Sequence, residues 1–342
     1  MRTRDRFEPE VSMLFSEMLP ELRVILKQVA LEDGNLPDPT LLPATEGRLL
    51  VEQLSQRWNR NQPNVAEVAE RWLFPDYTLG SSTTRIKIFV PEKPGAGAIL
   101  FAHGGGFCFG SPETHERTAR LLAIAASMPV LVPDYRLAPE YPFPAGLKDL
   151  VACMRESVNL ASSLGGTPGP LIMAGESAGA NLALCAVLHE LQEGRACPDG
   201  AVLLCGTYGL GTSTDSYIRY RDGPGLTKAK MQRYLRWYCG NRDLSNEPLA
   251  CPLAASDQLL VGLPPVRLFA AGIDPLSSDS VLLGKRLTAL GRLDEVTIVP
   301  GVTHAFTNYS VAFDLAEVVL AEAGRSARKF AKAAELDWRP SP

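Results

Sequence analysis

Short apolar runs alternate with helix-like segments along most of this chain, and this alternation limits the fold more than any other feature. Near-continuous apolar strands separated by helices indicate a mostly parallel sheet that is covered by helices on both faces. The predicted strands are RIKIFVPE (85–92), GAILFAH (97–103), PVLVPDY (129–135), PLIMAG (170–175), AVLLCG (201–206), PPVRLFAAG (264–272) and EVTIVPG (295–301). The apolar residues between them recur every three or four positions, which predicts helices over 115–127, 143–164, 180–193 and 277–291.

Two stretches depart from the alternation. The first sixty or so residues are predicted to be helical, over 9–32 and 44–62, and no strand pattern precedes WLFPDYTLG (72–80). The stretch 208–250 is rich in Tyr, Arg and Gly and contains no clear strand. Both stretches are therefore candidates for a second layer over the sheet.

Composition and charge exclude several classes of protein. With 342 residues and 46% apolar residues, the chain can bury a large core. The formal net charge of −4 comes from well-mixed signs, without the basic stripe that nucleic-acid binding requires. No apolar stretch approaches the roughly 20 residues that span a bilayer, and MRTRDRFEPE does not resemble a signal peptide. We expect a soluble, cytoplasmic protein with no stable membrane insertion.

The cysteines do not suggest a disulfide framework or a metal site. There are seven, they are widely spread, and none forms a C-x-x-C pair. We expect buried free thiols.

A nucleophile motif follows the strand PLIMAG. The sequence GESAG (175–179) has the pattern G-x-S-x-G between a predicted strand and a predicted helix, which is the setting that a nucleophile elbow requires. The turn is so sharp that residues two before and two after Ser177 must lack side chains. The alternative, a serine that only caps a helix in a tight loop, is less consistent with this context.

A serine nucleophile needs a base, and the chain has four histidines. His103 leads a glycine run, His115 opens a helix, and His189 lies about 18 Å along the helix after Ser177 at 1.5 Å per residue. His304 follows the last predicted strand, at the sheet edge where such sites assemble. We identify His304 as the base by elimination and by position.

The third member of a triad is a carboxylate between the serine and the histidine in the chain. Asp274 comes directly after the strand PPVRLFAAG and is predicted to orient the imidazole and stabilise its cation. Asp279 is the rival, five residues later. We interpret Asp279 as a helix N-terminal charge worth about 0.3–1 kcal/mol in stability.

The glycine run in HGGGFCFG (103–110) fits an oxyanion hole. Backbone N–H groups must approach the developing oxyanion closely, and side chains would block that approach. We predict that the amides of Gly105 and Gly106 act with that of Ala178, the residue after the nucleophile. His103 is then a residue that organises the loop. A phosphate cradle is disfavoured, because neither G-x-G-x-x-G nor a P-loop lysine follows.

In combination these motifs resemble the bacterial hormone-sensitive lipase family (family IV) of α/β-hydrolases. The resemblance rests on HGGG followed by F-x-F-G-S (103–111), DYRLAPEYPFPA (134–145), GESAG, DPL (274–276) and the late HAF (304–306), and extends from about Arg85 to about Asn308. Two departures are Glu176, where the family usually has Asp or Thr, and Ala305, where it usually has Gly. Both could alter the geometry of the elbow and of the histidine loop.

The resemblance implies an α/β-hydrolase fold with a helical cap over the active site. The division would be an N-terminal cap segment (1–70), a cap insertion (208–250), and a catalytic domain formed by 71–207 and 251–342. It also implies a serine carboxylesterase for small-molecule esters of short to medium chain, with no cofactor and no metal. A homodimer is left open.

Two other functions remain open at this point. One is an amidase or peptidase-like serine hydrolase. The other is a non-catalytic small-molecule receptor on the same fold, as in the gibberellin receptors, which have lost the histidine that this chain keeps as His304.

Aromatic residues are candidates for the substrate pocket. Those in the cap insertion have helical spacing, and aromatic residues with that spacing more often pack against a core. The substrate-binding candidates are Phe107, Tyr208, Tyr234, Trp237 and Tyr238.

Overall fold

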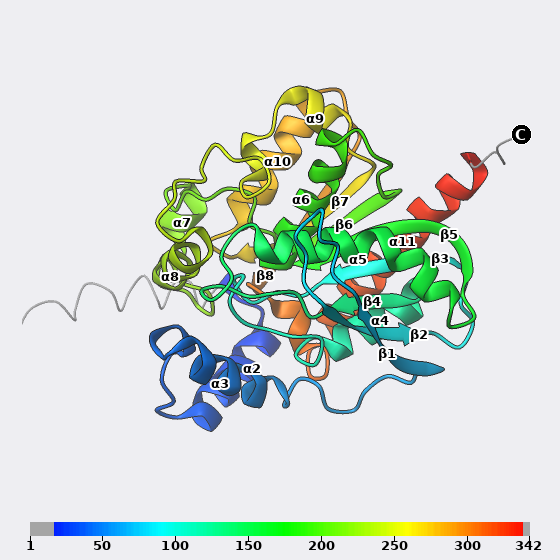
Figure 1. Cartoon of the computed structure of the whole chain (residues 1–342). Coiled ribbons are helices and arrows are strands. Elements are labelled where there is room, and N and C mark those ends of the chain that lie inside the picture. The colour runs from blue at the N-terminus through cyan, green and yellow to red at the C-terminus, as the bar shows by residue number, and fades with distance from the viewer. Residues whose placement is uncertain (1–16, 338–342) are drawn as a thin grey trace, which may run out of the picture.

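The computed structural model describes residues 17–337, which form an eight-stranded sheet between two layers of helices (Figure 1). Each strand predicted from the sequence is present, with ends shifted by a few residues. The strands are β1 (Glu67–Leu73), β2 (Thr84–Val90), β3 (Ala96–Ala102), β4 (Val130–Pro133), β5 (Thr167–Glu176), β6 (Gly200–Leu204), β7 (Val266–Ile273) and β8 (Glu295–Thr303).

The strand order is β1-β2-β4-β3-β5-β6-β7-β8. The pairs β1–β2 and β2–β4 are antiparallel, and every later pair is parallel. The prediction of a mostly parallel sheet is therefore confirmed. In a parallel sheet the carboxyl ends of neighbouring strands meet at one edge, and this edge carries the loops after β3, β5, β7 and β8.

Each predicted helical segment contains a helix in its described part, whereas α9 and the long α11 were not predicted. The helices are α2 (Pro20–Asp33), α3 (Ala44–Ser55), α4 (Glu116–Ala126), α5 (Ala145–Ser162), α6 (Ala178–Gln192), α7 (Asp215–Arg219), α8 (Lys228–Cys239), α9 (Asp257–Val261), α10 (Ser277–Ala289) and α11 (Asp314–Asp337), with short 3₁₀ turns η1 (Pro39–Leu41), η2 (Pro252–Ala254) and η3 (Phe306–Tyr309). Residues 9–16 of the first predicted helix lie outside the described residues.

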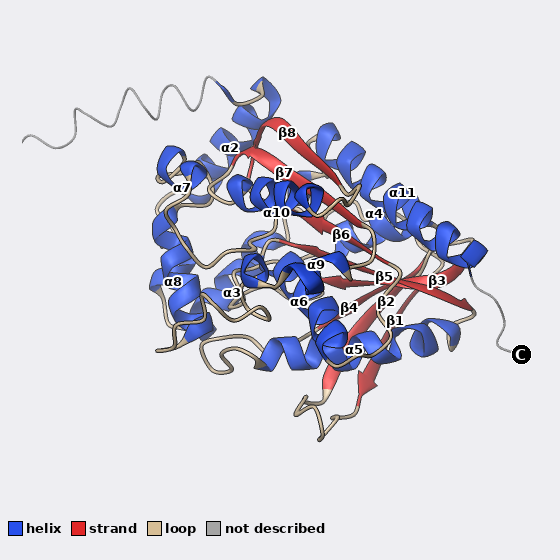
Figure 2. Cartoon of the chain, turned by 90° about the horizontal axis from the view of Figure 1, so that it is seen from above, coloured by secondary structure: helices blue, strands red, loops and turns tan. Residues whose placement is uncertain are grey.

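Alternating side chains divide the core between the two faces of the sheet. Along β3, Leu100 belongs to one apolar cluster, and its neighbours Ile99 and Phe101 belong to the other. The cluster with Leu100 is completed by α5, α6 and α10, and the other by α4 and α11, as Figure 2 shows from above. Helix α6 is buried almost all round, as its Ala- and Leu-rich sequence dictates.

Strand β1 corrects the expectation that no strand precedes Trp72. It begins at Glu67 and pairs antiparallel with β2 at the sheet edge, with Trp72 opposite Arg85. Only Ala69 of its residues is buried. An edge strand with so little burial has no apolar alternation for the sequence to reveal.

The two segments outside the alternation lie at the same end of the molecule, where α2 and α3 approach α7 and α8 (Figures 1 and 2). Arg233 of α8 joins them, because its Nε donates to Thr40 Oγ1 at 2.6 Å and its Nη2 to Asp38 Oδ2 at 2.7 Å. On the other side, Arg48 of α3 donates to the carbonyl oxygens of Cys108 and Ala138. These contacts attach α3 to the loop that follows the glycine run and to the loop after β4.

All seven cysteines lie within the described residues, and none is in a disulfide. Cys197 and Cys239 are half-buried, which corrects the expectation that all of the thiols are buried. In residues 17–337 no helix is both long enough and apolar enough to span a membrane.

Candidate active site

Ser177 lies in a sharp turn between β5 and α6. Its backbone has φ 56° and ψ −119°, a conformation that costs a non-glycine residue of order 1–3 kcal/mol. A Cβ on Gly175 would lie 2.5 Å from the carbonyl carbon of Gly179, and one on Gly179 would lie 2.0 Å from the carbonyl oxygen of Ala102. Both glycines are therefore required for the turn that exposes the serine.

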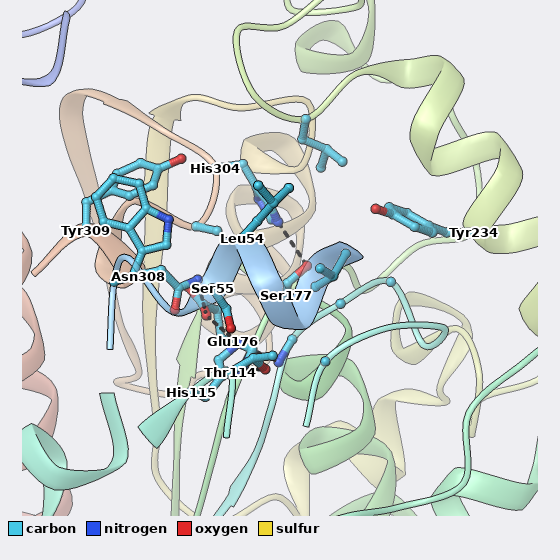
Figure 3. Close-up of a pocket in the computed structure, with 18 of the residues that line it drawn as sticks. Leu54, Ser55, Thr114, His115, Glu176, Ser177, Tyr234, His304, Asn308 and Tyr309 are labelled. Carbon is cyan, nitrogen blue, oxygen red and sulfur yellow. Dashed lines mark hydrogen bonds and ion pairs between the residues drawn. The ribbon is translucent and has the colours of Figure 1, made fainter. Parts of the chain in front are cut away.

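His304 and Asp274 complete a chain of hydrogen bonds that begins at Ser177. The Nε2 of His304 lies 2.9 Å from Ser177 Oγ, and its Nδ1 lies 2.7 Å from Asp274 Oδ2 (Figure 3 shows the first contact). Asp274 is fully buried, and its Oδ1 accepts the amide of Leu276 at 2.9 Å. The structure thus brings together the three residues that the sequence singled out, from the loops after β5, β7 and β8.

The electrostatics favour a basic imidazole. Burial by itself lowers the pKa of His304, but the charge and the hydrogen bond of Asp274, together with the charge of Glu176, outweigh burial, and the pKa lies above the ordinary 6.5. The carboxylate also fixes the tautomer, because Nδ1 must carry a proton to donate to it. Nε2 is left free to accept the proton of Ser177.

Asp279 has a role different from the one expected. It lies in the first turn of α10, but it is buried, and its Oδ2 accepts the amides of Tyr208 at 2.8 Å and of Gly209 at 3.0 Å. Burial raises its pKa to about 6, although these two amides lower it. Asp279 therefore holds the chain after β6, and the interpretation as a simple helix-end charge is wrong.

We expect Asp279→Ala to destabilise the fold far more than a helix-end charge would. The substitution leaves the buried amide of Tyr208 and the half-buried amide of Gly209 without an acceptor, and a buried donor without a partner costs about 1–3 kcal/mol. Urea unfolding followed by circular dichroism measures the change. A loss of free energy of unfolding below about 1 kcal/mol would restore the helix-end interpretation.

The glycine run forms one wall of the site. Gly105 has φ +122°, and a Cβ there would lie 2.1 Å from the carbonyl oxygen of Phe109. Gly106 has φ +61°, and a Cβ there would lie 2.4 Å from the ring of Tyr234. Within residues 17–337 the amides of Gly105, Gly106 and Ala178 find no hydrogen-bond acceptor. The three amides predicted for an oxyanion hole are thus available to a ligand.

His103 organises this loop rather than entering the site. Its Nδ1 lies 2.9 Å from the carbonyl oxygen of Gly104, and its ring stacks on Tyr135 with centroids 4.2 Å apart. The hydroxyl of Tyr135 donates to the His103 carbonyl oxygen at 2.7 Å. This arrangement agrees with the role predicted from the sequence.

A cavity of about 330 Å³ opens above Ser177. Its apolar wall comes from α3 and the residues after it, with Val51, Leu54 and Trp58, and from the segment 208–250, with Leu226 and Met231. On the other side it is bounded by the glycine run and by the histidine loop. Figure 3 shows that Leu54 and Tyr234 lie on opposite sides of Ser177.

Only one of the five substrate-binding candidates lines this cavity, and it is Tyr234. Phe107 stacks on Tyr238 with ring centroids 3.7 Å apart. Tyr208 is buried in the segment after β6 whose amides Asp279 accepts. Trp237 packs against Phe109. These four contribute to packing, as their helical spacing or their place after a strand would indicate.

The sequence analysis missed several residues of the cavity. Leu54 and Trp58 fall in the predicted N-terminal helical region, but periodicity cannot show that a helix faces a site rather than a core. Glu176, Asn308 and Tyr309 flank the motif residues, and only their proximity in sequence could have suggested them. In residues 17–337 no group of three or more His, Cys, Asp or Glu side chains is arranged to hold a metal ion.

Comparisons with known proteins agree with this geometry. A family model described as the α/β-hydrolase fold matches residues 99–308. Carboxylesterase NlhH of Mycobacterium tuberculosis is 34% identical over 216 residues, which cover 62% of this chain and 67% of that protein. Esterase LipI of the same organism is 33% identical over 221 residues, which cover 64% and 68%.

Solved structures match over most of the chain. An ester hydrolase, EH1AB1, from the metagenome of Lake Arreo superposes with a TM-score of 0.84 at 30% identity, covering 91% of this chain and 98% of that one. A hyperthermophilic esterase from the archaeon Pyrobaculum calidifontis superposes with a TM-score of 0.83 at 28% identity, covering 92% and 99%.

Proposed function

Since this chain belongs to the α/β-hydrolase family, in its bacterial hormone-sensitive lipase branch, and is a carboxylic ester hydrolase, we propose that it acts through an acyl-enzyme on Ser177. We further propose that its substrates are small esters of short to medium chain. The observation that carries the proposal is the hydrogen-bond chain from Ser177 Oγ through His304 to Asp274. A buried serine, base and carboxylate in this order are what acyl transfer requires.

The first half-reaction forms the acyl-enzyme. Ser177 Oγ bonds to the ester carbonyl carbon while Nε2 of His304, 2.9 Å away, takes the hydroxyl proton. The carbonyl oxygen becomes an oxyanion, which the amides of Gly105, Gly106 and Ala178 stabilise. The bond from carbon to the alcohol oxygen then breaks, and the imidazolium returns its proton to the leaving alcohol.

The second half-reaction regenerates the serine. A water oxygen bonds to the acyl carbon while His304 Nε2 takes a proton from it. The bond to Ser177 Oγ breaks, and the imidazolium protonates that oxygen as the acid leaves. Asp274 stabilises the imidazolium in both halves and stays ionised.

We also propose that the two segments expected to form a cap, 1–70 and 208–250, cover this site, except that residues 67–70 belong to strand β1 of the sheet. Residues 1–16 lie outside the described part of the chain. Support comes from the cavity wall, which takes Leu54 from one segment and Met231 and Tyr234 from the other. The contact of Arg233 with Asp38 joins the two segments. A cap of this kind excludes water and selects the acyl chain.

The proposed function is tested with p-nitrophenyl esters of increasing acyl length, followed by the matching anilides. We expect kcat/KM to be greatest for short to medium chains and the anilides to react far more slowly, because an amine leaves less readily than a phenolate. Anilides that react as fast as the esters would instead favour an amidase.

The pH dependence should follow His304. Nε2 must be unprotonated to accept the serine proton, so kcat/KM falls as the pH drops through the pKa of His304 in the free enzyme. Because Asp274 holds that pKa above 6.5, we expect the midpoint of the acid limb above pH 6.5. The measurement is kcat/KM from pH 5 to 9 with one neutral ester. A midpoint well below 6.5 would contradict this assignment of the base.

Leu54 should affect acyl-chain preference. Leu54→Ala removes apolar wall beside Ser177, so longer acyl chains gain room, and each buried methylene is worth about 0.8 kcal/mol, or roughly fourfold in kcat/KM. We expect the ratio of kcat/KM for octanoate over butyrate to rise at least fourfold. Leu49→Ala on the same helix is the matched control, since Leu49 is 72% exposed. Equal ratios in both variants would show that α3 does not select the chain.

A further inference from the structure

Glu176, the residue before the nucleophile, has a buried carboxyl group that the mechanism above does not use. Its side chain is 1% exposed. Thr307 Oγ1 donates to its Oε1 in a close contact, and Asn308 Nδ2 donates to its Oε2 at 3.1 Å. The Nε2 of His115 lies 3.2 Å from the same Oε2. A carboxylate this buried is tolerated only with such a set of partners.

The partners of Glu176 lie in or beside the loops that carry the catalytic groups. Thr307 and Asn308 lie in η3, which begins two residues after His304. His115 is the residue before α4, and its Nε2 also lies 3.2 Å from the amide nitrogen of Gly104 in the glycine run. Figure 3 shows Glu176, His115 and Asn308 grouped on one side of Ser177. One carboxylate thus connects the nucleophile turn with the histidine loop, and it lies beside the His115 nitrogen that accepts the Gly104 amide.

The charge of Glu176 also acts on the base. Burial by itself raises the pKa of Glu176, but the contacts with His115 and the hydrogen bond from Thr307 outweigh burial, so the pKa lies below its usual value and the group is ionised at neutral pH. After the contribution of Asp274, the negative charge of Glu176 raises the pKa of His304 further. The charges of two carboxylates therefore raise the pKa of His304.

Building on the proposed ester hydrolysis, we propose that Glu176 is a positioning residue that fixes the histidine loop relative to Ser177 and stabilises the His304 imidazolium. In Glu176→Gln the side chain keeps its size but loses its charge and exchanges one acceptor for a donor. Turned toward Asn308 Nδ2, the new amide group meets another donor; turned toward Thr307 Oγ1, it obliges that hydroxyl to accept and leaves the hydroxyl proton without the carboxylate. Losing one hydrogen bond to a charged group corresponds to a factor of about 10–100.

Other titratable groups pack around this carboxylate, and their ionisation must be distinguished from that of Glu176 in the pH profile. Burial raises the pKa of Tyr309 to about 12 and that of Cys205 well above its usual value, so neither changes charge in the range of the assay. The groups that face Glu176 and His304 from the neighbouring elements are His115 before α4, Cys205 after β6, Asp274 after β7 and Tyr309 in η3.

The experiment compares the wild type with Glu176→Gln, Glu176→Asp and Glu190→Gln. Glu190 is the matched control, because it is also a buried carboxylate beside a histidine, with Oε1 3.0 Å from His189 Nδ1, but it lies at the far end of α6. Active sites are counted by titration with a p-nitrophenyl phosphonate, so that misfolded protein does not enter kcat. Thermal melts report stability.

We expect Glu176→Gln to lower kcat about 10–100-fold with little change in KM, and to move the acid limb of kcat/KM to lower pH. Glu176→Asp keeps the charge, so its acid limb stays at the wild-type pH even if kcat falls. In Glu190→Gln both kcat and the midpoint of the acid limb should stay at the wild-type values. The series is repeated in a His115→Gln background, where the shift should persist.

A wild-type kcat and acid limb in Glu176→Gln would overturn the proposal, as would a shift that disappears in the His115→Gln background. Equal shifts in Glu176→Gln and Glu176→Asp would also overturn it, because they would show packing rather than charge. These outcomes leave the proposed function intact, since that function fails only if the wild type does not hydrolyse esters or if Ser177 is dispensable.

Discussion

Ser177→Ala should abolish ester hydrolysis, with kcat falling by a factor of about 10⁴ or more, while the protein stays folded. The substitution removes the atom that attacks the carbonyl carbon, and among residues 17–337 no other group is hydrogen-bonded to His304 Nε2. Alanine also fits the space of serine. Stopped assays at high enzyme concentration give kcat, and a thermal melt gives Tm.

His304→Ala should approach the same loss, since members of a triad act as a unit. Combining the two substitutions should add little to either one alone. If either single variant retained a tenth of the wild-type activity, Ser177 and His304 would not be the nucleophile and base.

Asp274→Asn should lower kcat by as much as about 10⁴. An asparagine amide that donates toward His304 Nδ1 would hold the ring in the wrong tautomer, with the proton on Nε2 and no base facing Ser177. The imidazolium would also lose the carboxylate that stabilises it.

Asp279→Asn is the matched control for this substitution. Both backbone donors to Asp279 reach the same oxygen, Oδ2, so an asparagine carbonyl can accept both, and we expect kcat to stay near the wild-type value. Measuring kcat and Tm for both variants under identical conditions separates the two carboxylates. An inactive Asp279→Asn beside a fully active Asp274→Asn would show that the wrong acid is assigned to the site.

The sheet and the triad geometry were predictable because local signals determine them. A buried parallel strand must be apolar along its whole length, which made β3, β5, β6 and β7 visible in the sequence. The turn at Ser177 needs small residues at fixed offsets, so its pattern survives in a single sequence. Once the sheet order is parallel, the residues that follow β5, β7 and β8 must meet at one edge.

The remaining features depend on contacts between distant segments, which no local pattern records. Strand β1 has one buried residue, so its pairing with β2 is visible only in the fold. Phe107 and Tyr238 are aromatic like Tyr234, but they stack on each other, and only Tyr234 faces the cavity. Asp279 occupies a helix-start position, yet its partners are 70 residues away or more.

The central claim is that Ser177 becomes the covalent nucleophile, and a p-nitrophenyl alkylphosphonate tests it most directly. Attack forms a bond from Ser177 Oγ to phosphorus and releases p-nitrophenolate, and the product does not turn over readily. We predict one p-nitrophenolate per protein, complete loss of esterase activity, and the phosphonyl mass on the peptide that carries Ser177, with no reaction in Ser177→Ala. A phosphonyl group found on another residue of an inactivated protein, or full esterase activity after stoichiometric labelling of Ser177, would contradict the account.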